Sequence, residues 1–354
     1  LFRSKPRWHE KAKSIFKLEL TGEYKGVSLA ETGLEKLRVY INGQWHHTLK
    51  VYELLFKHSI GIAIDNGVEG IKYLSKNQLK AVGFETHEAV VPYSQRSAAG
   101  YRLLVENFTF PEKFRFFELE GIRGALPKNS NKCDIYIYLD TESSELEKQV
   151  DEDMFLLGCT PIINLFEQEL EPIRPEISEY EYQLAPRYMD SEISEVIGIS
   201  EVIAFDHKGN KQVVAPFYGQ THPNYQGHED LFWHIRRETA SWAGGYVESG
   251  TETFMSLVDA KFENSAMEYG EGNSVLTVRA HCSNRNLPAS MPFGDDELGL
   301  LMPERGDVIK KIRCLAPFTH AVRPVLADAT RWQLVNHLTL DTFSGEDACN
   351  KLKE

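Results

Sequence analysis

The stretch YRLLVENFTFPEKFRFFEL, residues Tyr101 to Leu119, changes its hydrophobic period in the middle. Up to Asn107 its apolar residues recur at helical spacing, and from Phe114 onward they are dense and aromatic, as in a buried strand. The residues that carry the two patterns are Leu103, Leu104 and Phe108 for the helix, and Phe114, Phe116 and Leu119 for the strand. Pro111 marks the break, because proline has no amide proton to continue a helix and favours extended backbone at Phe110.

Five phenylalanines lie close together in this stretch, at positions Phe108, Phe110, Phe114, Phe116 and Phe117. Each contributes about 2 to 3 kcal/mol to folding if it is fully buried. We therefore expect the stretch to form a core around which the chain before and after it packs.

Outside this stretch, alternating apolar residues predict further strands. These lie at residues 16–20, 37–41, 60–64, 133–140, 196–205 and 309–315, and residues 254–258 and 275–280 are expected to form a pair of strands. Helical spacing recurs at residues 48–58 and again at 330–340, where Trp332 is expected on a buried helical face. The pattern predicts an α+β fold of mainly antiparallel β structure, with two strand-rich domains and helices packed on the sheets.

The chain of 354 residues exceeds the size that one hydrophobic core usually serves, and its apolar content of 42% suffices for packed cores. An acidic run from Glu167 to Glu181 contains Pro172 and Pro175 and is typical of a domain connection. The sequence therefore predicts one domain over residues 1–180 and a second over residues 181–354.

The net charge of −13 argues against a nucleic-acid ligand, since affinity for a phosphate backbone depends on Lys and Arg. Five widely spaced cysteines, with no CxxC pair, favour reduced thiols in the cytoplasm. No apolar run approaches the roughly 20 residues that a bilayer-spanning helix needs. We expect no direct membrane insertion, so that any membrane contact goes through a partner.

Motifs for catalysis are sparse. His222, His228 and His234 form the best local histidine cluster, but HEDLFWH lacks the fixed spacing of a compact zinc site. No GxSxG elbow, GxxxxGK[ST] phosphate loop or GxGxxG motif after a strand is present. We expect neither an enzyme nor a cofactor, with a metal-dependent hydrolase that uses the three histidines as the alternative.

A small set of aromatic and arginine residues follows the histidines and consists of Trp233, Arg236, Arg237 and Trp242. Such residues are enriched in interface hot spots, so this set is a candidate for partner binding. Two other interpretations remain open. Trp233 can belong to the core with the arginines in solvent, and exposed Trp242 and Tyr246 can belong to a carbohydrate-binding β-sandwich.

The block HCSNRNLP, from His281 to Pro288, has an architectural interpretation. Asn284, Arg285 and Asn286 follow a predicted strand and precede Pro288, where their side chains can satisfy the backbone carbonyls of a sharp turn. Ligand binding by this block remains an alternative.

Four blocks in the same order resemble those of the TssF family, the baseplate wedge subunits of bacterial type VI secretion systems. They are YRLLVENFTFPEKFRFFEL at 101–119, GCTPIINLFEQELEPI at 158–173, HCSNRNLP at 281–288 and WQLVNHLTL at 332–340. Members of the family are normally longer at both ends, so the resemblance indicates an interior fragment.

The resemblance implies a structural protein in a cytoplasmic baseplate docked at the inner membrane. It implies a wedge in which two TssF copies join one TssG, assembling with TssK and TssE around the VgrG spike. TssK would connect the wedge to the membrane complex, and the baseplate would be the platform on which tube and sheath grow.

Overall fold

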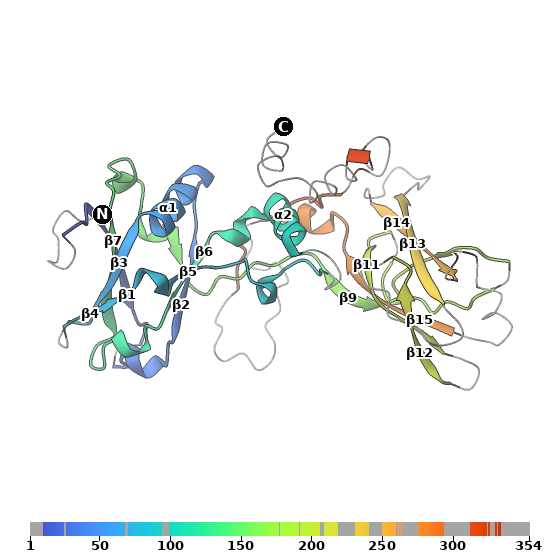
Figure 1. The fold of residues 1–354 in the computed structure, drawn as a ribbon, viewed down its shortest axis with the longest axis horizontal. Coiled ribbons are helices and arrows are strands. Elements are labelled where there is room, and N and C mark those ends of the chain that lie inside the picture. Colours follow the sequence, from blue (N-terminus) through green and yellow to red (C-terminus); the bar gives the residue numbers. More distant parts are fainter. Residues whose placement is uncertain are drawn as a thin grey trace. The chain divides into compact units, whose positions relative to one another are not determined.

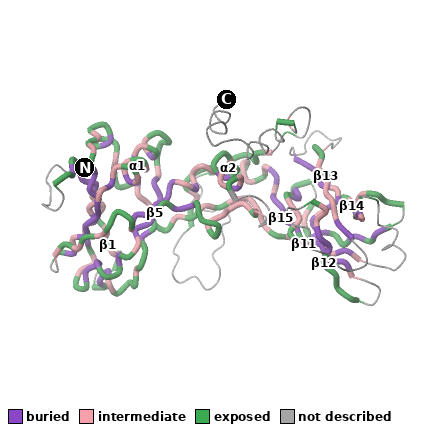
Figure 2. Tube along the Cα trace, viewed as in Figure 1, coloured by how far each residue is buried: buried purple, intermediate pink, exposed green. Residues whose placement is uncertain are grey.

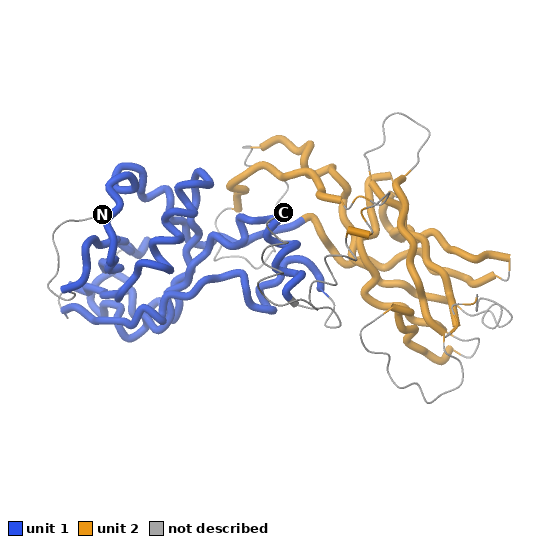
Figure 3. The backbone as a smooth tube through the Cα atoms, turned by 45° about the horizontal axis from the view of Figure 1, so that its top comes forward, with its two compact units in different colours: residues 1–163 blue, residues 164–354 orange. Residues whose placement is uncertain are grey.

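The computed structural model describes residues 10–24, 26–67, 70–93, 99–176, 178–190, 192–205, 209–218, 231–240, 250–259, 275–293 and 312–323, and a few single positions besides. The chain divides into two compact units, residues 1–163 and 164–354 (Figure 3). Each unit has its own sheets and its own hydrophobic core, shown as the buried segments of Figure 2.

The first unit contains two four-stranded antiparallel sheets (Figure 1). One has the order β1-β7-β3-β4, formed by Ser14–Thr21, Lys132–Leu139, Ser59–Asp65 and Ile71–Leu74. The other has the order β5-β6-β2-β8, formed by Leu79–Ala81, Phe116–Glu120, Lys36–Ile41 and Phe155–Leu156. Its described residues form two α-helices, α1, Trp45–Lys57, and α2, Ala99–Thr109.

One core joins the two sheets and α1. Ile135 and Ile137 of β7, Phe117 of β6, and Val51 and Leu55 of α1 are all buried in it. Because side chains alternate along a strand, Tyr136 and Tyr138 of β7 lie on the opposite face, in a smaller cluster. The helix α1 is therefore held by its apolar stripe, as its helical spacing predicts.

The second unit contains a seven-stranded sheet in the order β10-β14-β13-β12-β11-β15-β9. Its strands are β9 Phe166–Glu169, β10 Tyr182–Gln183, β11 Glu195–Phe205, β12 Lys211–Pro216, β13 Phe232–Thr239, β14 Thr251–Val258 and β15 Val275–Ser283. All pairings are antiparallel except β12 with β13, which spans two residue pairs. Residues of β11, β14 and β15 share one core, which confirms the prediction of a mainly antiparallel α+β fold.

The stretch Tyr101–Leu119 has the predicted order of elements, with α2, a 3-10 turn at Pro111–Phe114, and β6. The prediction that all five phenylalanines form a core is wrong. Phe116 and Phe117 are buried and Phe110 and Phe114 are partly buried, but Phe108 is 80% exposed. The helical face of α2 that packs inward is the charged one.

Three further expectations differ from the structure. The strands at 254–258 and 275–280 do not pair with each other, because β14 pairs with β13 and β10, while β15 pairs with β11 and β9. Of the strand predicted at 309–315, residues 312–315 are not a strand and residues 309–311 lie outside the described residues. Most of the helix predicted at 330–340 lies outside them too, and Trp332 lies in a helical turn but is 73% exposed, so it is not a core residue.

The division between the units falls at residue 163, whereas the acidic run predicts it near residue 180. Residues 164–180 belong to the second unit because β9 pairs with β15 and because Leu170 and Ile173 are buried in the second core. In the residues that the structure describes, no helix is long and apolar enough to cross a membrane.

Candidate functional site

The helix α2 presents charge to the protein and apolar side chains to solvent. Arg102 and Glu106 lie four residues apart on one helical face and are both buried. Leu104, Val105 and Phe108 lie on the other side and are all exposed. Because the two charged residues of α2 are buried, its exposed face carries no charged side chain, which makes it a candidate interface.

Glu106 is the centre of a buried ionic cluster. Its Oε2 accepts hydrogen bonds from Arg102 Nη1 at 2.9 Å and from Lys113 Nζ. Its Oε1 accepts from the backbone amides of Val90 at 2.8 Å and Val91 at 3.2 Å. The side chains of Glu106 and Lys113 are 0% and 1% exposed, so each charge is neutralised by a partner rather than by water.

The cluster also holds the chain segment that leads to α2. Arg102 Nη2 donates to the carbonyl oxygen of Phe84 at 2.9 Å, and the Glu106 carboxylate holds the two amides at Val90 and Val91. Burial opposes the charge on Glu106, but the hydrogen bonds from Lys113 and the two amides outweigh it and lower the pKa of Glu106. The carboxylate is therefore ionised at neutral pH and ties residues 84–91 to the helix.

The strand β13 places the predicted partner-binding residues on different faces. Trp233 packs against the core of the second unit, on the same side of the strand as Ile235. Arg237 lies on that side too and donates to the carbonyl oxygens of Val196 and Ile197 in β11. Burial lowers the pKa of Arg237.

Among the residues of this set that the structure describes, Arg236 is the one that points outward. Its guanidinium binds Glu181 through two nitrogens, at 2.9 and 2.7 Å, and it also contacts Glu238. The guanidinium lies 4.7 Å from the centroid of the Phe254 ring. Trp242, like Tyr246, lies outside the described residues, so the set is not brought together in the part that the structure describes.

The histidine cluster is represented in the described residues by His234, whose ring lies 5.6 Å from that of Tyr218. His222 and His228 lie outside them. The described residues contain no group of three His, Cys, Asp or Glu placed to bind a metal ion.

The block that follows β15 forms a turn around the buried Arg285. Asn164 Nδ2 donates to the carbonyl oxygen of Arg285 at 3.2 Å, and the amide of Asn284 donates to Asn164 Oδ1 at 3.2 Å. Arg285 has a φ of 50° and is buried, with its Nε donating to the carbonyl oxygen of Ser194 at 2.9 Å. Pro288 is the second residue of the 3-10 turn at Leu287–Ser290. The side chain of Asn164 bonds the backbone of this turn, whereas the side chain of Arg285 bonds the backbone of Ser194.

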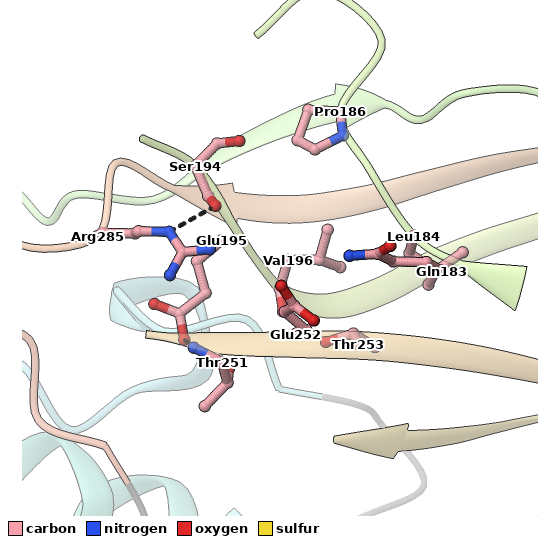
Figure 4. Close-up of a pocket in the computed structure, with 10 residues that line it drawn as sticks. All are labelled: Gln183, Leu184, Pro186, Ser194, Glu195, Val196, Thr251, Glu252, Thr253 and Arg285. Atoms are coloured by element: carbon pink, nitrogen blue, oxygen red, sulfur yellow. Dashed lines mark hydrogen bonds between the residues drawn. The ribbon is translucent and has the colours of Figure 1, made fainter. Parts of the chain in front are cut away.

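A glycine allows this arrangement. A Cβ atom at Gly250 would lie 2.0 Å from Nη1 of Arg285, so any larger residue there would displace the guanidinium. Beside the arginine is a cavity of about 20 Å³, lined by Glu195, Thr251 and Arg285 among others (Figure 4). It has room for about one water molecule and is far smaller than the ~300 to 1,000 Å³ of ligand pockets.

Three buried carboxylates were not singled out from the sequence, Glu106, Glu118 and Glu195. The spacing of Arg102 and Glu106 is a recognisable i, i+4 pair, but the same spacing is common on solvated helical faces. Glu195 pairs with Arg323, 128 residues later, and no local pattern marks such a pair.

Comparisons with known proteins agree on one family. A family model described as "Type VI secretion system, TssF" matches residues 3–354. The chain is 28% identical over 333 residues to the type VI secretion system component TssF1 of Pseudomonas aeruginosa, covering 90% of this chain and 52% of that protein.

A solved structure has a similar fold. It is a cryo-electron microscopy structure of the type VI secretion system TssK-TssF-TssG baseplate subcomplex, with a TM-score of 0.62 and 22% sequence identity. The match covers 86% of this chain and 54% of that chain. The chain thus spans about half the length of the relatives it matches.

Proposed function

The chain belongs to the TssF family of type VI secretion system proteins, and from this premise we propose that it is a structural component of the secretion baseplate. The match of the family model to residues 3–354 carries the proposal, because it spans both units. The similarity of fold to a chain of the TssK-TssF-TssG subcomplex supports it. The protein acts by assembly and needs neither a cofactor nor a catalytic residue.

The partners follow from the same premise. We infer that the chain forms a wedge with TssG and a second TssF copy, contacts TssK on the side of the membrane complex, and assembles with TssE around the VgrG spike in the cytoplasm. TssG and TssK are the best supported of these partners, since both belong to the subcomplex that contains the chain of similar fold.

The exposed face of α2 is the surface that we expect one of these partners to cover. Leu104, Val105 and Phe108 are apolar and exposed on a helix whose charged residues are turned inward. A helix of this kind gains little from facing water, and burying its face against another subunit removes apolar area from solvent. The buried cluster around Glu106 keeps this face turned outward.

The experiment is reconstitution with the TssG and TssK of the same bacterium. The chain is co-expressed with TssG, with TssK and with both, and each mixture is passed over a sizing column with light scattering. We expect a stable complex that contains this chain and TssG. Absence of any complex with either subunit, alone or together, would contradict the proposal.

A pair of surface variants tests the role of α2. Phe108→Ser is expected to weaken the measured affinity for the partner at least tenfold, because it removes the most exposed aromatic side chain of the face. Val213→Ser, which also replaces an exposed apolar side chain by serine but on β12, is the control and should leave that affinity unchanged. Equal effects of both variants on the affinity would show that α2 is not part of the interface.

A further inference from the structure

Residues 312–323 lie in the second unit as an irregular segment without a single buried residue. Ile312, Leu315 and Val322 are exposed, and Val322 is 71% exposed. In the part of the chain that the structure describes, hydrogen bonds hold this segment to two side chains, Glu195 and Asn286. The segment is therefore held at one end by polar contacts and gains little from apolar burial.

Arg323 makes the main contact. Its Nη2 donates to Glu195 Oε2 at 2.8 Å, and its Nε lies 3.1 Å from Oε2 and 3.3 Å from Oε1 of the same carboxylate, so two guanidinium nitrogens contact both carboxylate oxygens. Nη1 lies 3.4 Å from Asn286 Oδ1, and the same oxygen accepts the amide of Ala321 at 2.9 Å. Arg323 keeps 20% of its side chain exposed, whereas Glu195 keeps 2%.

Glu195 is held in position without help from Arg323. Its Oε1 accepts hydrogen bonds from both the amide, at 2.9 Å, and the hydroxyl, at 2.5 Å, of Thr251. These two residues are the first residues of β11 and β14, which belong to the same sheet without being paired, so the carboxylate is fixed by the sheet. The turn at Arg285, bonded to Ser194, positions Asn286 beside it.

This arrangement favours a guanidinium over other cations. A carboxylate and an amide oxygen present several acceptors in directions that match the planar fork of donors of arginine. An ammonium group has no such fork and is more strongly hydrated. The nearby Arg237 does not fill the position, since its donors go to the carbonyl oxygens of Val196 and Ile197.

We propose that Glu195 and Asn286 form a preformed arginine-binding site on the second unit, which Arg323 of the same chain occupies, so that residues 312–323 are a detachable strap. The site persists when the arginine leaves, because Thr251 holds the carboxylate. An empty site takes another guanidinium, and the strap opens without unfolding the sheet.

The first test measures hydrogen exchange of the whole chain by mass spectrometry. Arg323→Gly is expected to speed exchange at least tenfold at the Ala321 amide, which donates to Asn286 Oδ1, while leaving β11 and β15 unchanged. Arg313→Gly, an exposed arginine on the same segment, is the matched control and should change strap exchange less than twofold. Similar exchange in the parent chain and both variants would overturn the proposal, and so would faster exchange throughout the sheet.

The second test fills the vacated site with a small molecule. Ethylguanidinium chloride is titrated into Arg323→Gly, and the amide signals of Thr251 and Asn286 are followed by NMR, with ethylammonium chloride as the matched probe. We expect saturable shifts with ethylguanidinium, at least tenfold tighter than with ethylammonium, and none in the parent chain or in Arg323→Gly with Glu195→Gln. Equal shifts with both probes, or equal shifts in all three proteins, would contradict a preformed guanidinium site.

A third variant covers the case in which Arg323→Gly fails to fold. Arg323→Lys keeps the charge but loses the two-point contact, and strap exchange is expected between the parent rate and that of a freely exposed segment. A parent-like rate in this variant would show that charge alone holds the strap, against the proposal.

Discussion

Glu106 in the first unit and Glu195 in the second are both buried carboxylates that bind cationic side chains, but they differ in where the partners come from. Glu106 binds Arg102 and Lys113, which are four and seven residues away in the sequence. Glu195 binds Arg323, which is 128 residues away. Lys113 is almost fully enclosed, whereas Arg323 remains partly in water.

The difference shows that a buried carboxylate can serve two purposes. Around Glu106 every charge is enclosed, so removing one leaves the others buried without a partner, which is costly. Around Glu195 the cation can turn back into solvent, so the contact can break at a smaller cost. The first cluster is a permanent part of the unit, and the second is suited to a contact that opens and closes.

The largest effect is expected from Glu106→Ala. This variant leaves Arg102 and Lys113 buried without their anion and should reduce the free energy of unfolding of the first unit by about 3 to 5 kcal/mol. Urea titrations followed by hydrogen exchange of β6 measure it. Glu142→Ala, at an exposed carboxylate of the same unit, should leave the free energy of unfolding within about 0.5 kcal/mol of the parent value. A similar loss of stability in both variants would contradict a special role of the buried Glu106.

Glu195→Ala should have a smaller effect. It removes charged hydrogen bonds to Arg323 and Thr251, and since the arginine can reach water we expect a loss of about 1.5 to 3 kcal/mol in the second unit. Urea titrations followed by hydrogen exchange of β14 provide the measurement. A loss as large as that of Glu106→Ala would mean that the two sites are energetically alike, contrary to the comparison.

Lowering the pH should reduce the free energy of unfolding of both units, because these two carboxylates become protonated. Burial opposes the charge on Glu195, but Arg323 and Thr251 outweigh it, so its pKa is lowered like that of Glu106. The stabilisation is complete above the unfolded pKa of about 4.3 and is lost as the pH falls through the folded value, by at most about 1.4 kcal/mol per pH unit for each group.

Urea titrations between pH 6 and pH 3 check this dependence. Glu106→Gln should flatten the pH dependence of the first unit alone, and Glu195→Gln that of the second unit alone. A pH dependence that is unchanged in both variants would assign acid sensitivity to other carboxylates.

The smallest effect on stability is expected from Phe108→Ser, on the exposed face of α2. Because this ring is 80% exposed, the free energy of unfolding should change by less than about 0.5 kcal/mol. Phe116→Ser is the contrasting variant, at a buried ring five residues past the break at Pro111, and should lower the free energy of unfolding by several kcal/mol. A large loss at Phe108 would show that the face is packed within the chain.

Most elements could be predicted from local pattern. The alternation at β1, β2, β3, β7 and β11 and the spacing of α1 are visible in the sequence because one face of each element is buried. The sequence pattern does not show which strands pair with each other, which is why the predicted pairing of β14 with β15 was wrong. Pairing depends on contacts between residues far apart in the chain.

The sequence by itself determined the type and order of the longer elements, the mainly antiparallel α+β fold and the family, because each depends on short patterns or on blocks of residues in a set order. Only the tertiary structure decided which face of α2 turns inward and which arginine reaches Glu195. Hydrophobic period predicts that a helix has two faces, but a buried carboxylate with enough donors can reverse which one is covered. That balance depends on groups that only folding brings together.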